Sequence, residues 1–156
     1  MKQETRLVVN RQEYLVEVEP YETLAECLRE KLGLIGVRVS CNRGDCGSCT
    51  VLLDGEPIAS CMTLATEVDG RDITTIEGLA RAGELHPIQR SFIEHHGMQC
   101  GFCTPGMILS AKALLDRNSS PGEDDVREAI SGNLCRCGTY PKIVKSIMAA
   151  AKLMRV

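Results

Sequence analysis

Three cysteines fall within nine residues of this chain, and their spacing restricts the fold more than any other feature. The segment runs from Cys41 to Cys49, contains Gly44 and Gly47, and is followed by Cys61. The pattern is Cys-x4-Cys-x2-Cys, then eleven residues, then Cys. Glycines at these positions let backbone N–H groups close around the sulfurs of converging thiols. The fold must therefore form this loop and also return Cys61 to it.

This spacing is that of plant-type [2Fe–2S] ferredoxins. Two ferric ions, two sulfides and four thiolates leave a net charge of about −2, which nearby amide dipoles stabilise. A zinc site is the alternative, but structural zinc usually takes Cys-x2–4-Cys pairs rather than a Cys-x4-Cys-x2-Cys loop. The spacing and the glycines favour an iron–sulfur cluster on Cys41, Cys46, Cys49 and Cys61.

A second cysteine set lies in the other half of the chain, as Cys100-x2-Cys103 and Cys135-x-Cys137. Taken alone, these two pairs could hold zinc as readily as an iron–sulfur cluster. A redox-active dithiol at the first pair is disfavoured because no βαβ pattern surrounds it. The spacing therefore predicts a second metal centre and leaves its metal open.

Length and composition favour two small domains. The chain has 156 residues, and the two cysteine quartets fall in separate halves. Small domains have little core, which bound metal can supplement. Net charge is −3, with Lys and Arg spread along the chain, which argues against nucleic acid and membrane surfaces. Aromatic content is 3% with no Trp, so aromatic stacking is a poor candidate for ligand binding.

The cysteine count also bears on location. The N-terminal residues contain no apolar run resembling a signal peptide, and no later stretch is long and apolar enough to span a bilayer. Nine cysteines in such a chain predict metal ligands in a reducing, cytoplasmic compartment rather than disulfides. The ninth, Cys27, is expected to be a buried thiol on an amphipathic helix.

The first half predicts a mixed sheet crossed by one helix, with the cysteine loop at the edge of the sheet. The helix starts at Thr23, where Thr23 and Glu26 fit a capping box, and it stops at Gly33. The β-rich segments are residues 7–9 and 14–18, which form a hairpin, then 50–53, a turn at 54–57, and a strand near 72–76.

The second half predicts four helices after a linker. Gly78 and Gly83 lie in the linker, and the apolar residues that follow recur at helical spacing. The helices begin at Pro87, at Pro105, at Pro121 (ending near Ser131) and at Pro141. The predicted domains are residues 1–77, a linker over 78–86 and a helical domain over 87–156, and the four helices form a bundle.

Two longer segments resemble the small iron–sulfur subunit of the molybdenum hydroxylases, the xanthine dehydrogenase family, which includes aldehyde oxidoreductases and carbon monoxide dehydrogenases. The segments are Gln99–Met107, QCGFCTPGM, and Gly132–Cys137, GNLCRC. The resemblance covers essentially the whole chain. It implies an α+β fold with a ferredoxin-like β-grasp domain first and a four-helix bundle second, each holding one [2Fe–2S] cluster. Gly138-Thr139-Tyr140 replaces the Thr-Gly-Tyr of many relatives and touches no cysteine.

The same resemblance implies an electron-transfer function. Single electrons would pass from a molybdenum–pterin cofactor on a large subunit, through both clusters, to FAD on a medium subunit or to an external acceptor. The assembly would be a hetero-oligomer such as a dimer of heterotrimers. The helical-domain cluster would lie nearer molybdenum, and its implied ligands are Cys100, Cys103, Cys135 and Cys137.

The resemblance also implies roles for individual residues. Gln99 and Cys137 match positions that approach the pterin, although Gln99 could instead satisfy a backbone group at a helix end. No catalytic residue is expected on this chain. The histidines are expected at the surface or at helix ends, and Arg136 could stabilise cluster charge or form a surface ion pair. The three histidines are His86, His95 and His96.

Two alternatives from other classes remain. A free two-cluster ferredoxin would be monomeric when purified, whereas a subunit would expose an apolar interface and co-purify with larger chains. A binding module with one iron–sulfur cluster and one structural zinc would contain zinc and half the iron of two clusters.

Overall fold

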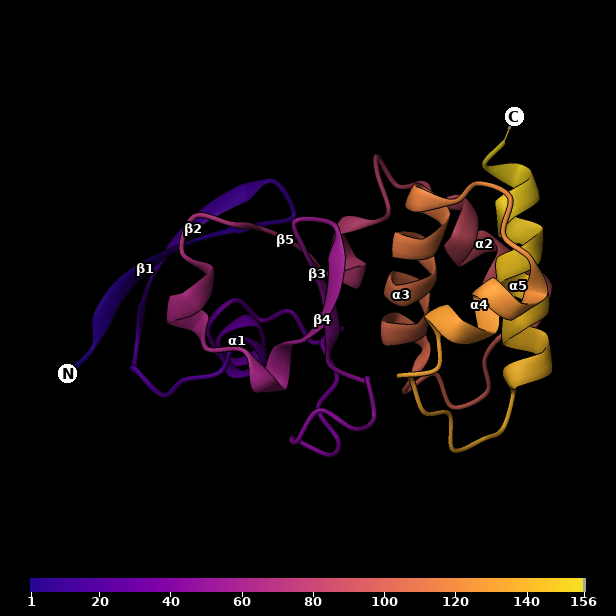
Figure 1. Ribbon diagram of the computed structural model, residues 1–156. Coiled ribbons are helices and arrows are strands. Elements are labelled where there is room, and N and C mark those ends of the chain that lie inside the picture. The colour runs from indigo at the N-terminus through magenta and orange to yellow at the C-terminus, as the bar shows by residue number, and fades with distance from the viewer. Residues whose placement is uncertain (156) are drawn as a thin grey trace.

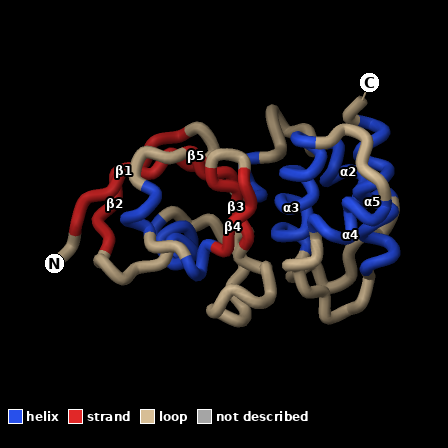
Figure 2. The backbone as a smooth tube through the Cα atoms, in the orientation of Figure 1, coloured by secondary structure: helices blue, strands red, loops and turns tan. Residues whose placement is uncertain are grey.

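The first half of the chain folds into a five-stranded mixed sheet with one short helix, described in a computed structural model that covers residues 1–155 (Figures 1 and 2). The strand order is β2-β1-β5-β3-β4. β1 and β5 are parallel, and the other neighbouring pairs are antiparallel. The strands are β1 Gln3–Val9, β2 Gln12–Val18, β3 Thr50–Leu53, β4 Glu56–Ala59 and β5 Asp72–Thr74.

The N-terminal hairpin forms as predicted, with longer strands. Only Asn10 and Arg11 form the turn, with φ of 52° and 68°, and Val9 pairs with Gln12. Two consecutive residues at positive φ make the turn that matches the right-handed twist of a hairpin. The strands therefore extend into residues 12 and 13, which the sequence had suggested as loop.

The predicted helix start at Thr23 is confirmed. The Thr23 hydroxyl accepts from the Glu26 N–H at 3.2 Å, and the Glu26 carboxylate accepts from the Thr23 N–H at 2.9 Å. α1, Leu24–Glu26, continues as a π-helical turn, η1 Cys27–Lys31, and the chain leaves it through Gly33 at φ 68°. Cys27 is fully buried, as expected.

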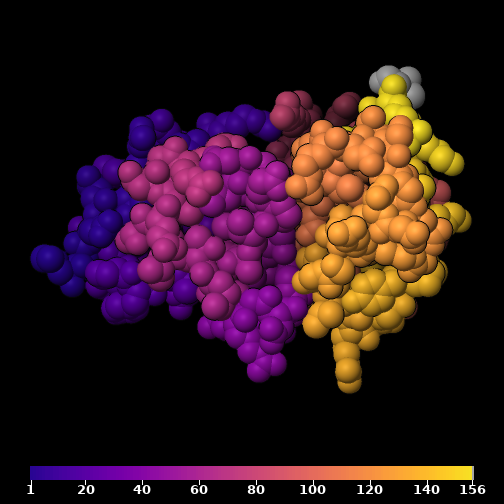
Figure 3. All heavy atoms as spheres, viewed as in Figure 1, coloured from indigo at the N-terminus to yellow at the C-terminus, as the bar shows by residue number. Residues whose placement is uncertain are grey.

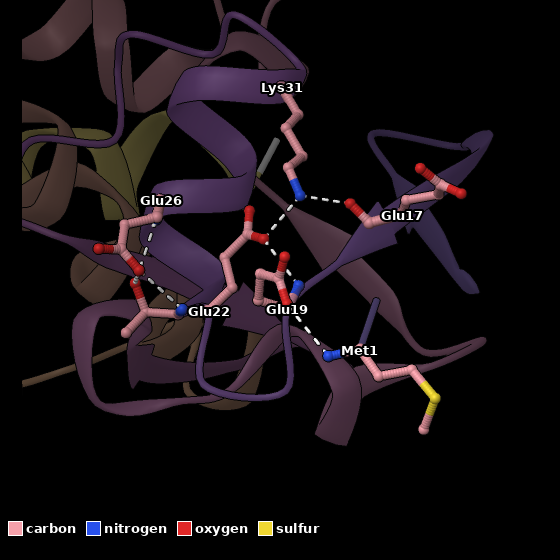
Figure 4. A network of polar contacts seen from close by, with 7 residues as sticks. Met1, Glu17, Glu19, Glu22, Glu26 and Lys31 are labelled. Carbon is pink, nitrogen blue, oxygen red and sulfur yellow. Dashed lines mark hydrogen bonds and ion pairs between the residues drawn. The ribbon is translucent and has the colours of Figure 1, made fainter. Parts of the chain in front are cut away.

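A polar network ties this helical segment to the end of β2 (Figure 4). The Lys31 ammonium lies 2.6 Å from the Glu22 carboxylate and also donates to the Glu17 carbonyl. The Glu22 carboxylate also accepts from the Glu19 N–H at 3.1 Å. Because the Lys31–Glu22 ion pair is partly solvated, it contributes at most about 1 kcal/mol to the free energy of unfolding. Its role is to fix the helical segment on the sheet.

The predicted turn at residues 54–57 is shorter in the structure. Asp54 and Gly55 make the turn at positive φ, and β4 already begins at Glu56. Pro57 therefore lies within a strand. β4 is an edge strand, where the missing proline N–H is tolerated.

The second half contains the four predicted helices: α2 Pro87–Glu94, α3 Thr104–Arg117, α4 Glu123–Ala129 and α5 Tyr140–Leu153. α4 is shorter than the predicted 121–131 because Gly122 is its N-cap. No helix within residues 1–155 is long and apolar enough to cross a membrane. The largest fully buried side chains of this half are Ile88, Phe92, Met107, Leu109, Ile143 and Ile147.

The two halves pack directly against each other (Figure 3). α3 lies on β3 and β4, and Leu52 of β3 belongs to the same buried cluster as Phe92 and Met107. The sheet has its own core on the far side, around Leu7 and Leu24. Because one apolar cluster includes residues from both halves, their relative position is part of the fold.

Candidate metal centres

The cysteine-bearing loops of the two halves lie side by side along the lower edge of the molecule in the view of Figure 1. The loop before β3 carries Cys46, and the connection between α4 and α5 carries Cys135. These segments are joined directly, because the Leu134 N–H donates to the Cys46 carbonyl at 2.9 Å. The fold thus places the two cysteine sets next to each other, which neither spacing alone could predict.

In the first set, backbone N–H groups surround the Cys41 sulfur. Hydrogen bonds from the N–H groups of Arg43 and then Cys46 lower the pKa of the Cys41 thiol to about 6. The Cys46 N–H lies 3.4 Å from that sulfur. The loop achieves this wrap through positive φ at Asn42, Gly44 and Gly47. A thiolate is the metal-binding form of cysteine, so the loop is built to stabilise a ligand.

The other two thiols of this set approach from the strand side. Burial, followed by the neighbouring Cys49 thiol, raises the pKa of Cys61 to about 11. The repulsion that Cys61 receives from Cys41 also contributes to this shift. The Ser60 hydroxyl donates to the Cys49 carbonyl at 2.6 Å and so holds the two segments together. The structure thus brings the thiols of Cys49 and Cys41 close to Cys61, and the backbone N–H of Cys46 contacts the Cys41 sulfur.

The second set forms where helices begin and connect. Cys103 is the N-cap residue of α3, and burial and then the Cys135 thiol raise its pKa to about 12. Burial also opposes ionisation of Cys135, but the Thr139 hydroxyl, 3.3 Å from its sulfur, helps lower its pKa to about 7. The Phe102 N–H and then the Cys137 thiol lower the pKa of Cys100. Residues 100, 103, 135 and 137 thus form a second convergent set.

A hollow of about 410 Å³ lies between the two loops. Cys100, Cys103 and Cys135 line it together with Cys46, and Phe102 and Leu134 supply apolar walls. A larger hollow of about 580 Å³ lies near the linker and has no cysteine in its lining. The smaller hollow is therefore the one whose residues suit a sulfur-bound group.

The donor sets suit a dinuclear group. Within residues 1–155, no three His, Cys, Asp or Glu side chains are arranged to hold one single metal ion. A [2Fe–2S] cluster spreads four thiolates over two irons, so its ligands need not meet at one point. Two separate groups of thiols, with amide N–H groups directed at Cys41 and a hollow beside Cys103, fit such clusters.

The remaining predicted residues occupy varied positions. Gln99 is exposed, and its side chain makes no hydrogen bond within the described part of the chain. The alternative that Gln99 satisfies a backbone group at a helix end is therefore not supported. Arg136 is exposed at the rim of the hollow and forms no ion pair among residues 1–155. The histidines lie at helix ends: His86 and His95 cap α2, and His96 follows it.

Three residues around the second set were missed from the sequence. The Tyr140 hydroxyl accepts from the Cys135 N–H at 2.9 Å and donates to the Asn133 carbonyl at 3.0 Å, while Thr139 contacts the Cys135 sulfur. They stand within or just after the GNLCRC segment. Proximity to that motif was the available signal, but it does not reveal which side chains turn inward.

Comparisons with known proteins agree with this arrangement. A family described as "2Fe-2S iron-sulfur cluster binding domain" matches residues 7–80, and one described as "[2Fe-2S] binding domain" matches residues 75–148. The nicotine 6-hydroxylase small subunit of Paenarthrobacter nicotinovorans is 48% identical over 142 residues, covering 91% of this chain and 86% of the relative.

Two solved structures of related oxidoreductases have the same fold. The structure of quinoline 2-oxidoreductase from Pseudomonas putida 86 superposes with a TM-score of 0.95 at 44% identity, covering 99% of this chain and 96% of that one. The aldehyde oxidoreductase from Desulfovibrio desulfuricans superposes with a TM-score of 0.94 at 42% identity. That match covers 98% of this chain but 17% of the larger protein.

The fold and the two cysteine sets define an electron-transfer protein with two [2Fe–2S] domains. The match over residues 75–148 decides the question that the second set left open, in favour of iron–sulfur over zinc. The chain belongs to the small iron–sulfur subunits of the molybdenum hydroxylase family, as its sequence motifs predicted.

Proposed function

We propose that this chain carries single electrons through two [2Fe–2S] clusters, from a molybdenum–pterin subunit to FAD on a medium subunit or to an external acceptor. The ligands would be residues 41, 46, 49 and 61 for the first cluster and 100, 103, 135 and 137 for the second. When bound, each cluster takes up and releases one electron at a time. One observation carries the proposal: the Cys46 carbonyl accepts from the N–H of Leu134, the neighbour of Cys135.

The chain's own residues hold both centres rigidly, which suits a carrier that changes little on reduction. Amide N–H groups of residues 43 and 46 stabilise negative charge on Cys41. Tyr140 and Thr139 fix the main chain and sulfur of Cys135. No acid–base residue is required, since the reaction at the substrate belongs to the larger subunit.

Exposed apolar side chains beside both cysteine sets support a subunit over a free ferredoxin. Phe102 and Leu134, next to the second set, are 39% and 55% exposed. Met62 and Ile35, close in sequence to the first set, are 62% and 68% exposed. Apolar surface of this kind commonly marks an interaction site. We assign the face around Phe102 to the molybdenum subunit and the face around Met62 to the acceptor side.

The proposal places Gln99 and Cys137 next to the pterin. Gln99 is exposed and Cys137 is half-buried, so both can be reached by a partner. The substrate is assigned to the larger subunit. Relatives of similar identity, 43–48%, are named for nicotine, nicotinate, xanthine and aldehydes, so similarity in this subunit does not follow the substrate. Nine cysteines without a disulfide, eight of them assigned as cluster ligands, fit a reducing cytoplasmic location.

The test is metal analysis and low-temperature EPR of the purified native complex. About four irons per chain and two distinct spin-one-half signals are expected after reduction. Cys103→Ser should remove one signal, and Cys46→Ser should remove the other together with acceptor reduction. Cys27→Ala is the matched control and should keep both. Zinc at either site, or acceptor turnover that survives Cys46→Ser unchanged, would contradict the proposal. Purification as a monomer without larger chains would favour the free ferredoxin.

A further inference from the structure

Asn133 connects the two cysteine-bearing loops with its side chain. It is 3% exposed and lies on the α4–α5 connection, two residues before Cys135. Its Nδ2 donates to the Gly47 carbonyl at 3.0 Å and lies 3.3 Å from the Thr50 hydroxyl. Gly47 directly follows Cys46, so this amide of the helical half grips the first cysteine loop.

The rest of Asn133 is fixed within the helical half. Its Oδ1 accepts from the Ser110 hydroxyl of α3 at 2.8 Å, and its backbone carbonyl accepts from the Tyr140 hydroxyl at 3.0 Å. That same hydroxyl accepts from the Cys135 N–H. A buried amide with all these partners resists rotation, because each broken contact leaves a buried polar group unpaired.

The glycines at this junction bring the main chains into direct contact. Gly47 has φ of 67°, and a Cβ on it would lie 2.3 Å from the Gly132 carbonyl oxygen. A Cβ on Gly106 of α3 would lie 2.4 Å from the Gly47 carbonyl oxygen. The first loop is therefore pressed between α3 and the α4–α5 connection, and Asn133 is the side chain that bonds across the contact.

We infer that Asn133 is a positioning residue that fixes the separation of the two cluster-bearing loops and so sets the rate of electron transfer between them. This role rests on the proposed function. The first loop does not depend on Asn133 for its own shape, because the Gly47 carbonyl also accepts from the N–H and hydroxyl of Thr50 at 3.2 and 2.7 Å. Removing the amide should therefore loosen the junction while leaving each cysteine set intact.

The experiment compares Asn133→Ala and Asn133→Asp with wild type in the purified, reduced complex. The aspartate keeps an acceptor for Ser110 but directs a carboxylate oxygen at the Gly47 carbonyl. The matched control is Asn118→Ala, since Asn118 is an exposed asparagine that caps only the Ser120 N–H. Iron content and both EPR signals should be retained in all three variants.

Two readouts separate a positioning role from a merely structural one. The magnetic interaction between the two reduced clusters, measured by EPR, should weaken in both Asn133 variants. In rapid mixing with substrate, the helical-domain signal should appear at the wild-type rate. The appearance of the other signal should slow several-fold, because electron transfer between two centres weakens as their separation grows. Unchanged coupling and unchanged rate in both variants would overturn the inference.

If Asn133→Ala does not load its clusters, Ser110→Ala tests the same junction, because it releases one end of the amide and keeps the bond to Gly47. Reduced coupling in that variant would support the role, and wild-type coupling would overturn it. A wild-type complex without two EPR signals would overturn the proposed function itself. Two normal wild-type signals with unaffected variants would overturn the role of Asn133 alone.

Discussion

The two cysteine sets reach similar chemistry by different routes. The first is local: three of its thiols belong to one loop, and the chain returns with Cys61 after a short hairpin. The second joins the start of α3 to the α4–α5 connection, so Cys103 and Cys135 meet only because the helices pack. The spacing of a ligand set within one loop favours one kind of metal centre, whereas the spacing of a set assembled by packing predicts a metal centre and leaves its metal open.

The two sets differ in what stabilises their charged thiol. Backbone N–H groups lower the pKa of Cys41 to about 6 in the first set, whereas in the second, against burial, the Thr139 hydroxyl helps lower the pKa of Cys135 to about 7. Burial raises the pKa of Cys61 to about 11 and that of Cys103 to about 12. Both sites therefore depend on bound metal to offset the cost of a buried thiolate.

Substitutions in the two cores should cause the largest losses of unfolding free energy. Met107→Ala removes a fully buried side chain of the bundle, and Leu7→Ala does the same in the sheet core. Each should cost about 2–5 kcal/mol. We expect Met107→Ala to lose the helical-domain EPR signal first on heating and Leu7→Ala to lose the other signal first. Thermal denaturation followed by EPR measures this, with Met62→Ala as the exposed control. The same order of loss in both variants would contradict separate cores.

Gly47→Ala should have the next largest effect, because it strikes the junction between the two sites. The alanine would have to adopt positive φ, and its Cβ would lie 2.3 Å from the Gly132 carbonyl oxygen. Together these should cost about 2–4 kcal/mol of unfolding free energy. Gly55→Ala is the control, since Gly55 has φ of 85° with open space around it, and only about 1–2 kcal/mol is expected. Equal losses in thermal denaturation would refute a close contact at Gly47.

Cys27 belongs to neither cysteine set, so its buried thiol can be compared with the proposed ligand thiols. Burial raises its pKa from 9.0 to about 11, so the folded state holds the proton more tightly than the unfolded state does. Its stabilisation is complete below the unfolded pKa and is lost as pH rises towards the folded value. The free energy of unfolding of the complex should therefore fall from pH 9.0 towards about 11 more steeply in wild type than in Cys27→Ala. Parallel curves for the two proteins would contradict this.

The helix caps give the smallest effects and differ between the two halves. Thr23→Ala should cost about 1 kcal/mol in chemical denaturation at neutral pH, because it removes the cap of α1.

His86 caps α2 through Nδ1, which accepts from the Ile88 N–H, and burial lowers its pKa. A lowered histidine pKa contributes stability above the unfolded value of 6.5 that is lost as pH falls. His86→Asn should flatten this acid dependence, and an unchanged slope would argue against the cap.

Several elements could be predicted because their causes are local. The capping box at Thr23, the prolines that open α2, α3 and α5, and the apolar spacing of the helices all act within a few residues. Finer limits depended on pairing. The hairpin turn is limited to residues 10 and 11 because Gln12 and Glu13 pair with β1, and β4 includes Pro57 because it is an edge strand.

The two cysteine sets, the two kinds of domain and, through resemblance, the family could be predicted from the amino-acid sequence. This was possible because ligand spacing, caps and hydrophobic periodicity are properties of neighbouring residues. The bonds from Leu134 to Cys46 and from Asn133 to Gly47 follow instead from the packing of the two halves. These residues are more than eighty positions apart, and their contact exists because α3 packs on β3 and β4 and so brings the two loops together.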